Sequence, residues 1–351
     1  MSSPVPVFDA KAMPFRRLGP SGLRVPLFSL GGWLTLGGSV VGESVKDIMQ
    51  AAENGINMFR HRGGLPESKI RGHAIKELGW RRTDLVISTK IFWSHEPGTG
   101  PNDTGLSHKH VIEGTKACLR RLQMDYVDVI FAHRCDTTVP MEEIVRAFNY
   151  VIDQGWAFYW GTSDTRSTDV ATRLNLIAPI AEQCKHNMFH RERPEKEYAP
   201  LYAKYGLGTT AFSALQGGLL TGKVYPPQPS NTRHALATVP MFPGATEGPQ
   251  GEELLWKVRL LSQIAAGASF LPDLLNSGRN RAGARVGCGA PPHFHSHPRR
   301  VLRRTARGEP RALEVLPKLD AAVLARIEAV LGNHPQEPET YGRPPLDQGI
   351  L

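Results

Sequence analysis

The stretch LRRLQMDYVDVIFAHR, residues 119–134, decides the fold of this chain. Its second half, VDVIFAH at 127–133, is an almost continuous hydrophobic run, which is typical of a parallel strand buried on both faces. The segment before it is predicted to be helical, because apolar residues recur at three- and four-residue steps and form one stripe that can pack on a sheet. The stripe consists of Val111, Thr115, Cys118 and Leu122. A helix followed by a buried strand is the repeating unit of an α/β protein.

The same unit recurs on both sides of this stretch. Short β-branched or aromatic runs alternate with longer amphipathic segments, as parallel βαβ units require. The predicted strands are the one in this stretch, at residues 126–133, and residues 56–59, 84–89, 157–163, 179–183 and 208–215. The predicted helices are residues 45–54, 109–122, 141–154, 168–176 and 194–205. We therefore predict an α/β fold, a (β/α)8 TIM barrel, with a doubly wound sheet as the alternative. No GxGxxG turn follows an early strand, which argues against a Rossmann domain.

The pattern breaks in the C-terminal third. Residues 266–311 are rich in Arg, Gly, Ala and Pro and lack periodicity, so the region of the last strand and helix is predicted to be disrupted, as a loop or a disordered insert. Beyond it, a closing amphipathic helix is predicted from three apolar residues: Leu324, Ile327 and Val330. The expected organisation is a tail, a barrel and a second tail at residues 1–13, 14–335 and 336–351.

The formal net charge of +9 is local rather than general. Between Arg279 and Arg311 there are nine arginines and one acidic residue, Glu309, a net charge of +8 that leaves only +1 for the rest of the chain. The charge therefore does not predict a nucleic-acid-binding protein.

Other features indicate a cytoplasmic protein that does not insert into a membrane. No segment approaches the roughly 20 apolar residues that cross a bilayer. The N-terminus, MSSPVPVFDAKAMPF, has no basic region followed by an apolar core, so we expect no secretory signal. The cysteines show no paired spacing, which favours free thiols in a reducing cytosol. They are Cys118, Cys135, Cys184 and Cys288.

A series of motifs resembles the aldo-keto reductase superfamily in order and spacing. FRRLGPSGLRVPLFSLGGW at 15–33 resembles the family's opening hairpin and first barrel strand, and the stretch at 119–134 also matches. Further matches are NGINMF (54–59), DLVISTKIFW (84–93), YWGTS (159–163), EQCKHNMFHRER (182–193) and LQGGLLTGK (215–223). The resemblance covers residues 14–235 and 312–334 and is closest to the branch that includes the β-subunits of voltage-gated potassium channels.

The resemblance implies a barrel that binds NADP(H) without a Rossmann fold and reduces aldehydes or ketones by hydride transfer. In that chemistry a Tyr donates a proton once a nearby Lys lowers its pKa, and a His positions the carbonyl oxygen. Lys90 closes the strand DLVISTK and His133 closes YVDVIFAH, and both match catalytic positions at strand ends. Taken alone, each also has a structural interpretation, as a solvated lysine or a hydrogen-bonded core histidine.

The resemblance also implies a cofactor site. Trp33 and Thr35 match contacts from the first strand, and Ser163 and Gln183 match residues that hold the nicotinamide carboxamide. Further positions, expected to stack on the nicotinamide or to contact phosphates, are Phe212, Ser213, Leu215, Lys223 and Arg233. The alternative for each lone Ser, Thr or Phe is ordinary packing.

Two classes of function follow from the resemblance. One is an NADP(H)-dependent reductase of a small carbonyl substrate, and the other is a non-catalytic regulatory protein similar to potassium channel β-subunits. Mammalian channel β-subunits typically carry Asn at the position of His133, and the first 14 residues are too short for an inactivating arm, so both features favour the enzyme. As protein partners, the resemblance implies a homo-oligomer or a potassium channel.

The catalytic stretch itself departs from the family pattern. After NGINMF the family has Asp-Thr-Ala-Glu-x-Tyr, whereas this chain has Arg-His-Arg-Gly-Gly-Leu at 60–65 and no Tyr between Phe59 and Trp80. The expected site for the adenine and the 2′-phosphate is likewise replaced by the Arg-rich segment. We therefore predict a destabilised and nearly inactive chain, because loss of a general acid commonly lowers the rate about 10²–10⁴-fold.

We hypothesise one cause for both departures, namely that residues 60–71 and 266–311 are translated one nucleotide out of frame. Read one base later, codons for residues 60–66 can encode Asp-Thr-Ala-Glu-Val-Tyr, and codons for residues 295–302 can encode Thr-Val-Ile-Leu-Gly-Ala-Ser, which resembles the family's phosphate-binding strand. On this interpretation the alternating histidines at 293–297 are not metal ligands, and we expect no metal site.

The underlying nucleotide sequence tests this hypothesis. Sequencing genomic DNA and transcript across residues 55–75 and 260–315 is expected to show codons that, read one base later, place Asp at position 60 and Tyr at position 65. Codons at 60–66 that cannot yield these two residues in the shifted frame would refute it.

Overall fold

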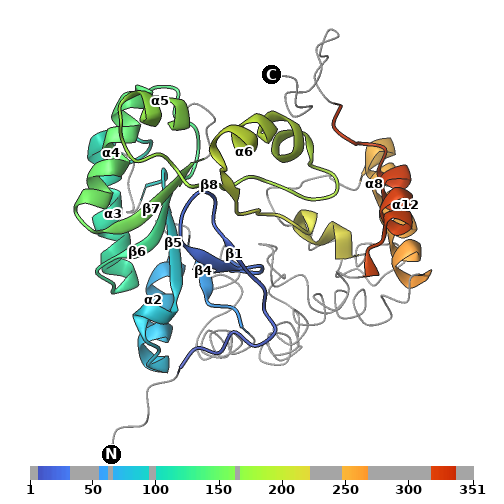
Figure 1. Ribbon diagram of the computed structural model, residues 1–351, viewed down its shortest axis with the longest axis horizontal. Coiled ribbons are helices and arrows are strands. Elements are labelled where there is room, and N and C mark those ends of the chain that lie inside the picture. The colour runs from blue at the N-terminus through green and yellow to red at the C-terminus, as the bar shows by residue number, and fades with distance from the viewer. Residues whose placement is uncertain are drawn as a thin grey trace, which may run out of the picture.

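A curled parallel sheet forms the centre of the described chain. The computed structural model describes residues 7–31, 55–61, 66–94, 100–162, 167–221, 247–267 and 318–336. Within these ranges, seven strands lie side by side in chain order (Figure 1). They are β3 (Leu30–Gly31), β4 (Met58–Arg60), β5 (Val86–Ile91), β6 (Val127–Ala132), β7 (Ala157–Thr162), β8 (Ala181–Glu182) and β9 (Gly208–Thr209). A doubly wound sheet reverses its strand order at a switch point, so this order excludes that alternative and is that of a barrel.

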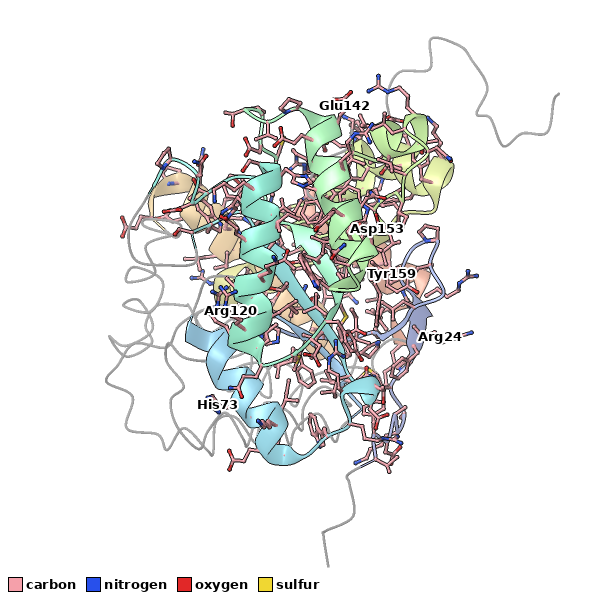
Figure 2. The ribbon with its side chains drawn as sticks, turned by 90° about the vertical axis from the view of Figure 1, so that its left-hand side faces the viewer. Arg24, His73, Arg120, Glu142, Asp153 and Tyr159 are labelled. Atoms are coloured by element: carbon pink, nitrogen blue, oxygen red, sulfur yellow. The ribbon has the colours of Figure 1, made fainter. Side chains whose placement is uncertain are left out.

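The six predicted strands are confirmed as β4 to β9, although β8 and β9 each span only two residues. Four helices cover the outer side of the sheet: α2 (Pro66–Leu78), α3 (His108–Leu122), α4 (Met141–Asp153) and α5 (Ser167–Arg173). In Figure 2, α4 runs from Glu142 to Asp153, and Arg120 near the end of α3 lies toward the same end as Asp153. The two helices are therefore parallel, as successive βαβ units require.

The remaining described elements are a hairpin before the sheet, one short helix before β5, and several helices after β8. A hairpin of β1 (Phe15–Arg17) and β2 (Arg24–Pro26) precedes the sheet, and the short helix η2 (Arg82–Asp84) leads into β5. After β8 the chain forms the π-helical turn η3 (Arg193–Glu197), α6 (Ala199–Tyr205), η4 (Gln216–Thr221), α8 (Gly248–Gly267) and α12 (Ala321–Leu331).

Helix α3 shows why these segments fold as they do. Its N-terminus is capped by Ser107, whose Oγ accepts a hydrogen bond from the backbone N–H of His110 at 3.2 Å. Its C-terminus ends at Gln123, which adopts the left-handed conformation with φ 56°. The predicted apolar stripe is confirmed, because all four of its members are buried against the sheet and its neighbours: Val111, Thr115, Cys118 and Leu122.

Side chains of the central strands alternate between two packing layers. Ile87, Ile91 and Ile130 belong to the layer between the sheet and the outer helices. Val86, Val129 and Phe131 belong to a second layer with Met58, and we call this side of the sheet the inner face. The alternation follows from the two-residue period of a strand. Both faces are therefore covered, which explains the continuous hydrophobic runs in the sequence.

The hairpin closes the inner face at the N-terminal ends of the strands. Leu18 and Val25 from the hairpin pack in the inner-face cluster. Gly19 lies so close to the starts of the late strands that a Cβ there would stand 1.9 Å from the carbonyl oxygen of Ile180 and 2.8 Å from the backbone nitrogen of Gly208. Among the described residues, the hairpin therefore leaves the opposite, C-terminal ends of the strands uncovered by its contacts.

Arg191 links the loop after β8 to the C-terminal helix. Its Nη1 donates to Glu328 Oε2 of α12 at 2.7 Å, and its other guanidinium nitrogens donate to Glu195 at 2.8–2.9 Å. The side chain of Arg191 is only 10% exposed, so these ion pairs are partly shielded from water. Helix α12 also packs on α8 through Val323 and Ile264.

Most of the helix predictions are confirmed, and one lies outside the described residues. The predicted segments 109–122, 141–154, 168–176 and 194–205 correspond to α3, α4, α5 and η3 with α6, whereas 45–54 lies outside the described residues. The closing helix is confirmed as α12, but one of its predicted apolar contacts is wrong. Leu324 is 48% exposed, and the buried side is formed by Val323 and Leu331 with Ile327 and Val330 packed beside them.

Two further predictions concern residues 266–311 and insertion into a membrane. Residues 268–317 lie outside the described ranges, so the disruption of the last strand and helix stays a prediction, although residues 266 and 267 end α8. Within the described chain, no helix is both long and apolar enough to cross a membrane.

The packing of Phe131 against Gly161 generates a stability prediction. A Cβ at Gly161 would meet Phe131 Cε1 at 2.2 Å and the carbonyl oxygen of Ala181 at 2.8 Å. We expect Gly161→Ala to lower the free energy of unfolding by about 1–3 kcal/mol in urea denaturation, because the clash lies in a packed core. Gly22→Ala is the matched control, since no heavy atom lies within 4 Å of its Cβ position. Equal stability of the two variants would contradict this description of the inner face.

Candidate active site

Lys90 and His133 lie at the C-terminal ends of adjacent strands. Lys90 is in β5 and pairs with Phe131 of β6. His133 follows β6 directly, and its backbone N–H donates to the carbonyl oxygen of Ile91 at 3.0 Å, which extends the β5–β6 ladder by one step. Both residues are partly buried. The structure thus brings the two predicted catalytic residues together at the C-terminal end of the sheet.

The side chain of Lys90 points to the inner face. Its neighbour Thr89 faces the helices, where its hydroxyl donates to Cys118 Sγ at 3.6 Å. Lys90 Nζ lies 5.8 Å from the centroid of the Phe212 ring, which follows β9 on the other side of the curled sheet. The ammonium therefore reaches across the inner face toward the late strands, and the contact is a cation–π interaction.

An aromatic side chain orients His133. The imidazole packs edge to face against Trp93, with 6.4 Å between ring centroids and 89° between ring planes. Trp93 is 41% exposed and itself packs edge to face against Phe92, with 5.0 Å between ring centroids. The imidazole therefore stands at the solvent-accessible edge of the site, where a substrate could reach it.

Arg60 occupies the position where the family pattern has Asp. It ends β4, and its Nη1 donates to the carbonyl oxygen of Ala211 at 2.8 Å. Burial lowers the pKa of Arg60 to about 10, so the guanidinium stays charged at neutral pH. In place of the carboxylate of the family pattern, the chain therefore has the guanidinium of Arg60, which extends from β4 to the segment after β9.

Two predicted cofactor residues, Gln183 and Phe212, lie just beyond the C-terminal ends of β8 and β9. Gln183 is buried, its backbone N–H donates to the carbonyl oxygen of Thr162 at 3.1 Å, and its side-chain amide donates to Thr210 Oγ1 at 3.1 Å. Phe212 pairs with Lys185 in an isolated parallel bridge. Gln183, Phe212 and Lys90 thus surround the same end of the sheet.

The segment after Phe212 is held by a residue that sequence reasoning missed. Asn187 is buried, and its Nδ2 donates to the backbone oxygen of Ser213 and to Gln216 Oε1, both at 2.9 Å. Ser213 and Gln216 have positive φ angles of 55° and 47°, and Leu215 lies between them. Asn187 fixes this unusual backbone, which was predicted to cradle the pyrophosphate. The sequence signal for it was only the match of EQCKHNMFHRER.

The other predicted cofactor residues lie outside the described ranges. They are Trp33, Thr35, Ser163, Lys223 and Arg233. Their roles stay predictions.

Two tyrosines near Glu182, the buried Tyr198 and the partly buried Tyr202, do not substitute for the absent Tyr. Tyr198 donates its hydroxyl to Glu182 Oε1 at 3.4 Å, and Glu182 alternates with the inner-face residue Gln183. Burial, with the charge of Glu182, raises the pKa of Tyr198, and burial likewise raises the pKa of Tyr202. An acid catalyst needs the opposite shift.

The two buried thiols and the metal-ligating residue types offer no other chemistry in the described chain, while a third cysteine, Cys135, is exposed. Cys118 and Cys184 are free and buried, and burial raises the pKa of both thiols, that of Cys184 to about 11. Thiols of this kind are poor nucleophiles. Among the described residues, no group of three or more His, Cys, Asp or Glu side chains could hold a metal ion.

The fold agrees with comparisons to known proteins. The aldo/keto reductase family matches residues 28–268, which is more than half of the chain. The chain therefore belongs to the aldo/keto reductase family, whose fold is the (β/α)8 barrel and whose members generally bind NAD(P)H.

Three relatives are named as potassium channel subunits. The chain is 42% identical over 342 residues to a "Probable voltage-gated potassium channel subunit beta" of Arabidopsis thaliana and 40% identical over 342 residues to a protein of the same name from Oryza sativa subsp. japonica. These matches cover 94% of this chain and 100% of each relative. A "Putative voltage-gated potassium channel subunit beta" of Schizosaccharomyces pombe is 41% identical over 353 residues, which cover 96% of this chain and 98% of that protein.

The role of Asn187 can be tested by its removal. We expect Asn187→Ala to lower the free energy of unfolding by about 1–3 kcal/mol, because it leaves buried backbone and amide groups without their partner. Urea denaturation measures this change. Asn102→Ala, at an exposed position, is the control and is expected to change stability by less than about 0.5 kcal/mol. A stability of Asn187→Ala equal to that of the control would rule out the anchoring role.

Proposed function

We propose that this chain is an NADP(H)-dependent oxidoreductase of aldehydes and ketones whose rate is low because its catalytic Tyr and Asp are absent. The observation that supports this proposal best is the juxtaposition of Lys90 and His133 at the ends of adjacent strands, on an inner face that also bears Gln183 and Phe212. Family membership supports the reaction class.

The described residues fit a nicotinamide cofactor. Gln183 is a buried amide held in place by Thr210, which suits a hydrogen bond to a carboxamide. Phe212 offers an aromatic ring beside the ammonium of Lys90, which suits stacking on a flat ring. The Ser213–Gln216 segment would approach the pyrophosphate with its backbone. When bound, NADPH would supply a hydride to the carbonyl carbon and leave as NADP⁺.

The protein's own part is to position the carbonyl and to deliver a proton. Lys90 and His133 would donate hydrogen bonds to the carbonyl oxygen, where negative charge develops in the transition state. As hydride reaches carbon, one proton must reach that oxygen to complete the alcohol. In the absence of the Tyr, the N–H groups of Lys90 and His133 are the donors that we assign to this step, with solvent returning the proton to the side chain.

This assignment predicts a slow enzyme that can be repaired. Wild-type protein is expected to reduce 4-nitrobenzaldehyde about 10²–10⁴-fold more slowly than family members with the complete set of catalytic residues, measured as NADPH oxidation. Lys90→Met and His133→Ala should abolish the residual rate. The double change Arg60→Asp with Leu65→Tyr should raise it, because it restores the family pattern at those two positions.

Controls separate catalysis from folding and binding. Lys76→Met, at an exposed position on α2, should keep the wild-type rate. NADPH affinity, measured by quenching of tryptophan fluorescence, should be similar in wild type and Lys76→Met. Reduction at family-typical rates by wild type, or an unchanged rate in Lys90→Met, would overturn the proposed mechanism.

A second candidate function is that of a potassium channel regulatory subunit, and the names of the three relatives favour it. In this role the cytoplasmic chain would form a homo-oligomer on the channel, and Lys90 and His133 would not need to catalyse turnover. Co-purification with a potassium channel, with light scattering to determine the oligomeric state, tests this role. Its success together with zero reductase activity would favour it over the enzyme.

A further inference from the structure

We propose that Asp128 and Arg82 are positioning residues, whose largely buried ion pair sets the register of β5 against β6 and thereby places Lys90 relative to His133. The effect on register stands by itself. The consequence for hydride transfer rests on the proposed function, so the two are tested separately.

The carboxylate of Asp128 begins the ladder between the two strands. Asp128 is the second residue of β6 and is buried. Its Oδ2 accepts hydrogen bonds from Arg82 Nη2 at 2.7 Å and from the backbone N–H of Ile87 at 2.8 Å. The first paired residues of the ladder, Ser88 and Val129, follow directly. The side chain of Asp128 therefore takes the place of a backbone carbonyl at the start of the ladder, and fixes which residue of β5 stands opposite it.

The guanidinium of Arg82 contacts the chain where it enters both strands. Nη1 donates to the carbonyl oxygen of Leu85, just before β5, at 3.0 Å. Nη2 donates to the carbonyl oxygen of Tyr126, just before β6, at 3.1 Å, and the guanidinium carbon lies 4.0 Å from the centroid of the Tyr126 ring. A slip of β6 by one residue would move Tyr126 and Asp128 by about 3.3 Å, which would break both hydrogen bonds that Arg82 makes to them.

Apolar packing opposes only some slips of this ladder. All of Val127–Ala132 is buried, and in Val86–Ile91 only Lys90 is not. Because side chains alternate with a period of two, a slip of two residues would leave every side chain on its own face, yet it would move Lys90 by about 6.6 Å relative to His133. Contacts between particular polar atoms oppose such a slip, whereas a row of similar apolar side chains opposes it weakly.

The ion pair is better suited to specifying a register than to adding stability. Burial raises the pKa of Asp128 against the opposing effects of Arg82 and the N–H of Ile87. A carboxyl whose pKa is raised by folding contributes stability below its unfolded pKa and loses that contribution as the pH rises through the folded pKa. At neutral pH the ionised carboxylate is therefore a cost of folding, and setting register is the best-attested use of such buried polar groups.

Lys90 and His133 belong to the same ladder. Lys90 pairs with Phe131 in its third step. The backbone N–H of His133 donates to the carbonyl oxygen of Ile91 one step further on. Because the pairing at the start of a ladder determines every later pairing, the contacts of Asp128 also determine which residues flank Lys90.

Hydrogen exchange of the full chain tests the effect on register. Deuterium uptake of β5 and β6 is measured by mass spectrometry and expressed relative to that of α4, so that a uniform change in stability cancels. We expect Asp128→Asn, which keeps the shape but removes the charge, to raise the exchange rate of the two strands relative to α4 at least roughly tenfold. Arg82→Lys keeps the charge but has no fork to span Leu85 and Tyr126, so it is expected to do the same.

Two controls separate register from general stability. Asn149→Ala removes a buried amide of α4 whose Oδ1 accepts from the backbone N–H of Ile177 at 2.8 Å, so it should destabilise the chain without raising this ratio. Lys109→Met removes only an exposed ion pair with Glu113 on α3 and should change nothing. An unchanged ratio in Asp128→Asn, or equal acceleration of all three elements, would overturn the inference. If Asp128→Asn does not fold, Arg82→Lys decides the result in the same way.

Kinetics test the consequence for the site. With NADPH and 4-nitrobenzaldehyde, Asp128→Asn is expected to lower kcat at least roughly tenfold. The KM for NADPH should change less than about twofold, because Gln183 and Phe212 lie beyond the late strands β8 and β9. An unchanged kcat would sink the placement of the two predicted catalytic residues by this ion pair. Absence of turnover in the wild type would sink the proposed function instead, while hydrogen exchange would still decide the register.

Discussion

The register between β5 and β6 is the constraint on which the rest of the described structure depends. Lys90 pairs with Phe131, and this pairing directs Ile87 and Ile130 to the helices and Val86 and Val129 to the inner face. Because side chains alternate with a period of two, a slip of one residue would exchange the two layers. It would bury an ammonium among the helices and turn the isoleucines toward the site. The register that packs the apolar side chains in their two layers therefore also places Lys90 on the inner face.

The inner face changes in character along the strands. At the N-terminal ends, Leu18 and Val25 of the hairpin seal it with apolar contacts. Phe131 fills the middle, where Gly161 leaves room for its ring. Beyond Phe131, toward the C-terminal ends of the strands, Arg60 and Lys90 on the early strands reach toward Ala211 and Phe212 on the late side. Packed apolar side chains thus fill the inner face below the polar C-terminal end of the barrel.

The sequence predicted what local patterns can encode. Strands buried on both faces and the apolar stripe of α3 were recognisable because each pattern lies within one short segment of the sequence. Helix α2 was missed although Ala74, Ile75 and Leu78 pack in the layer between the sheet and the outer helices. It also approaches α3 closely, since the carbonyl oxygen of Leu122 would stand 2.3 Å from a Cβ at Gly72. The contact of Arg60 with Ala211 joins residues 151 positions apart, and no local pattern encodes that distance. The placement of Leu324 was wrong because a stripe on one helix does not say which side its partner α8 covers.

Arg191 connects the C-terminal helix α12 to the loop after β8, which borders the candidate site. The same loop that begins with Gln183 and contains Asn187 is held through Arg191 to Glu328 of α12. Strain or order introduced in that loop by an occupant of the barrel mouth would therefore be transmitted to a helix more than a hundred residues later in the chain. A spectroscopic label attached to the exposed side of α12, for example at Leu324, would report on events at the mouth without touching it.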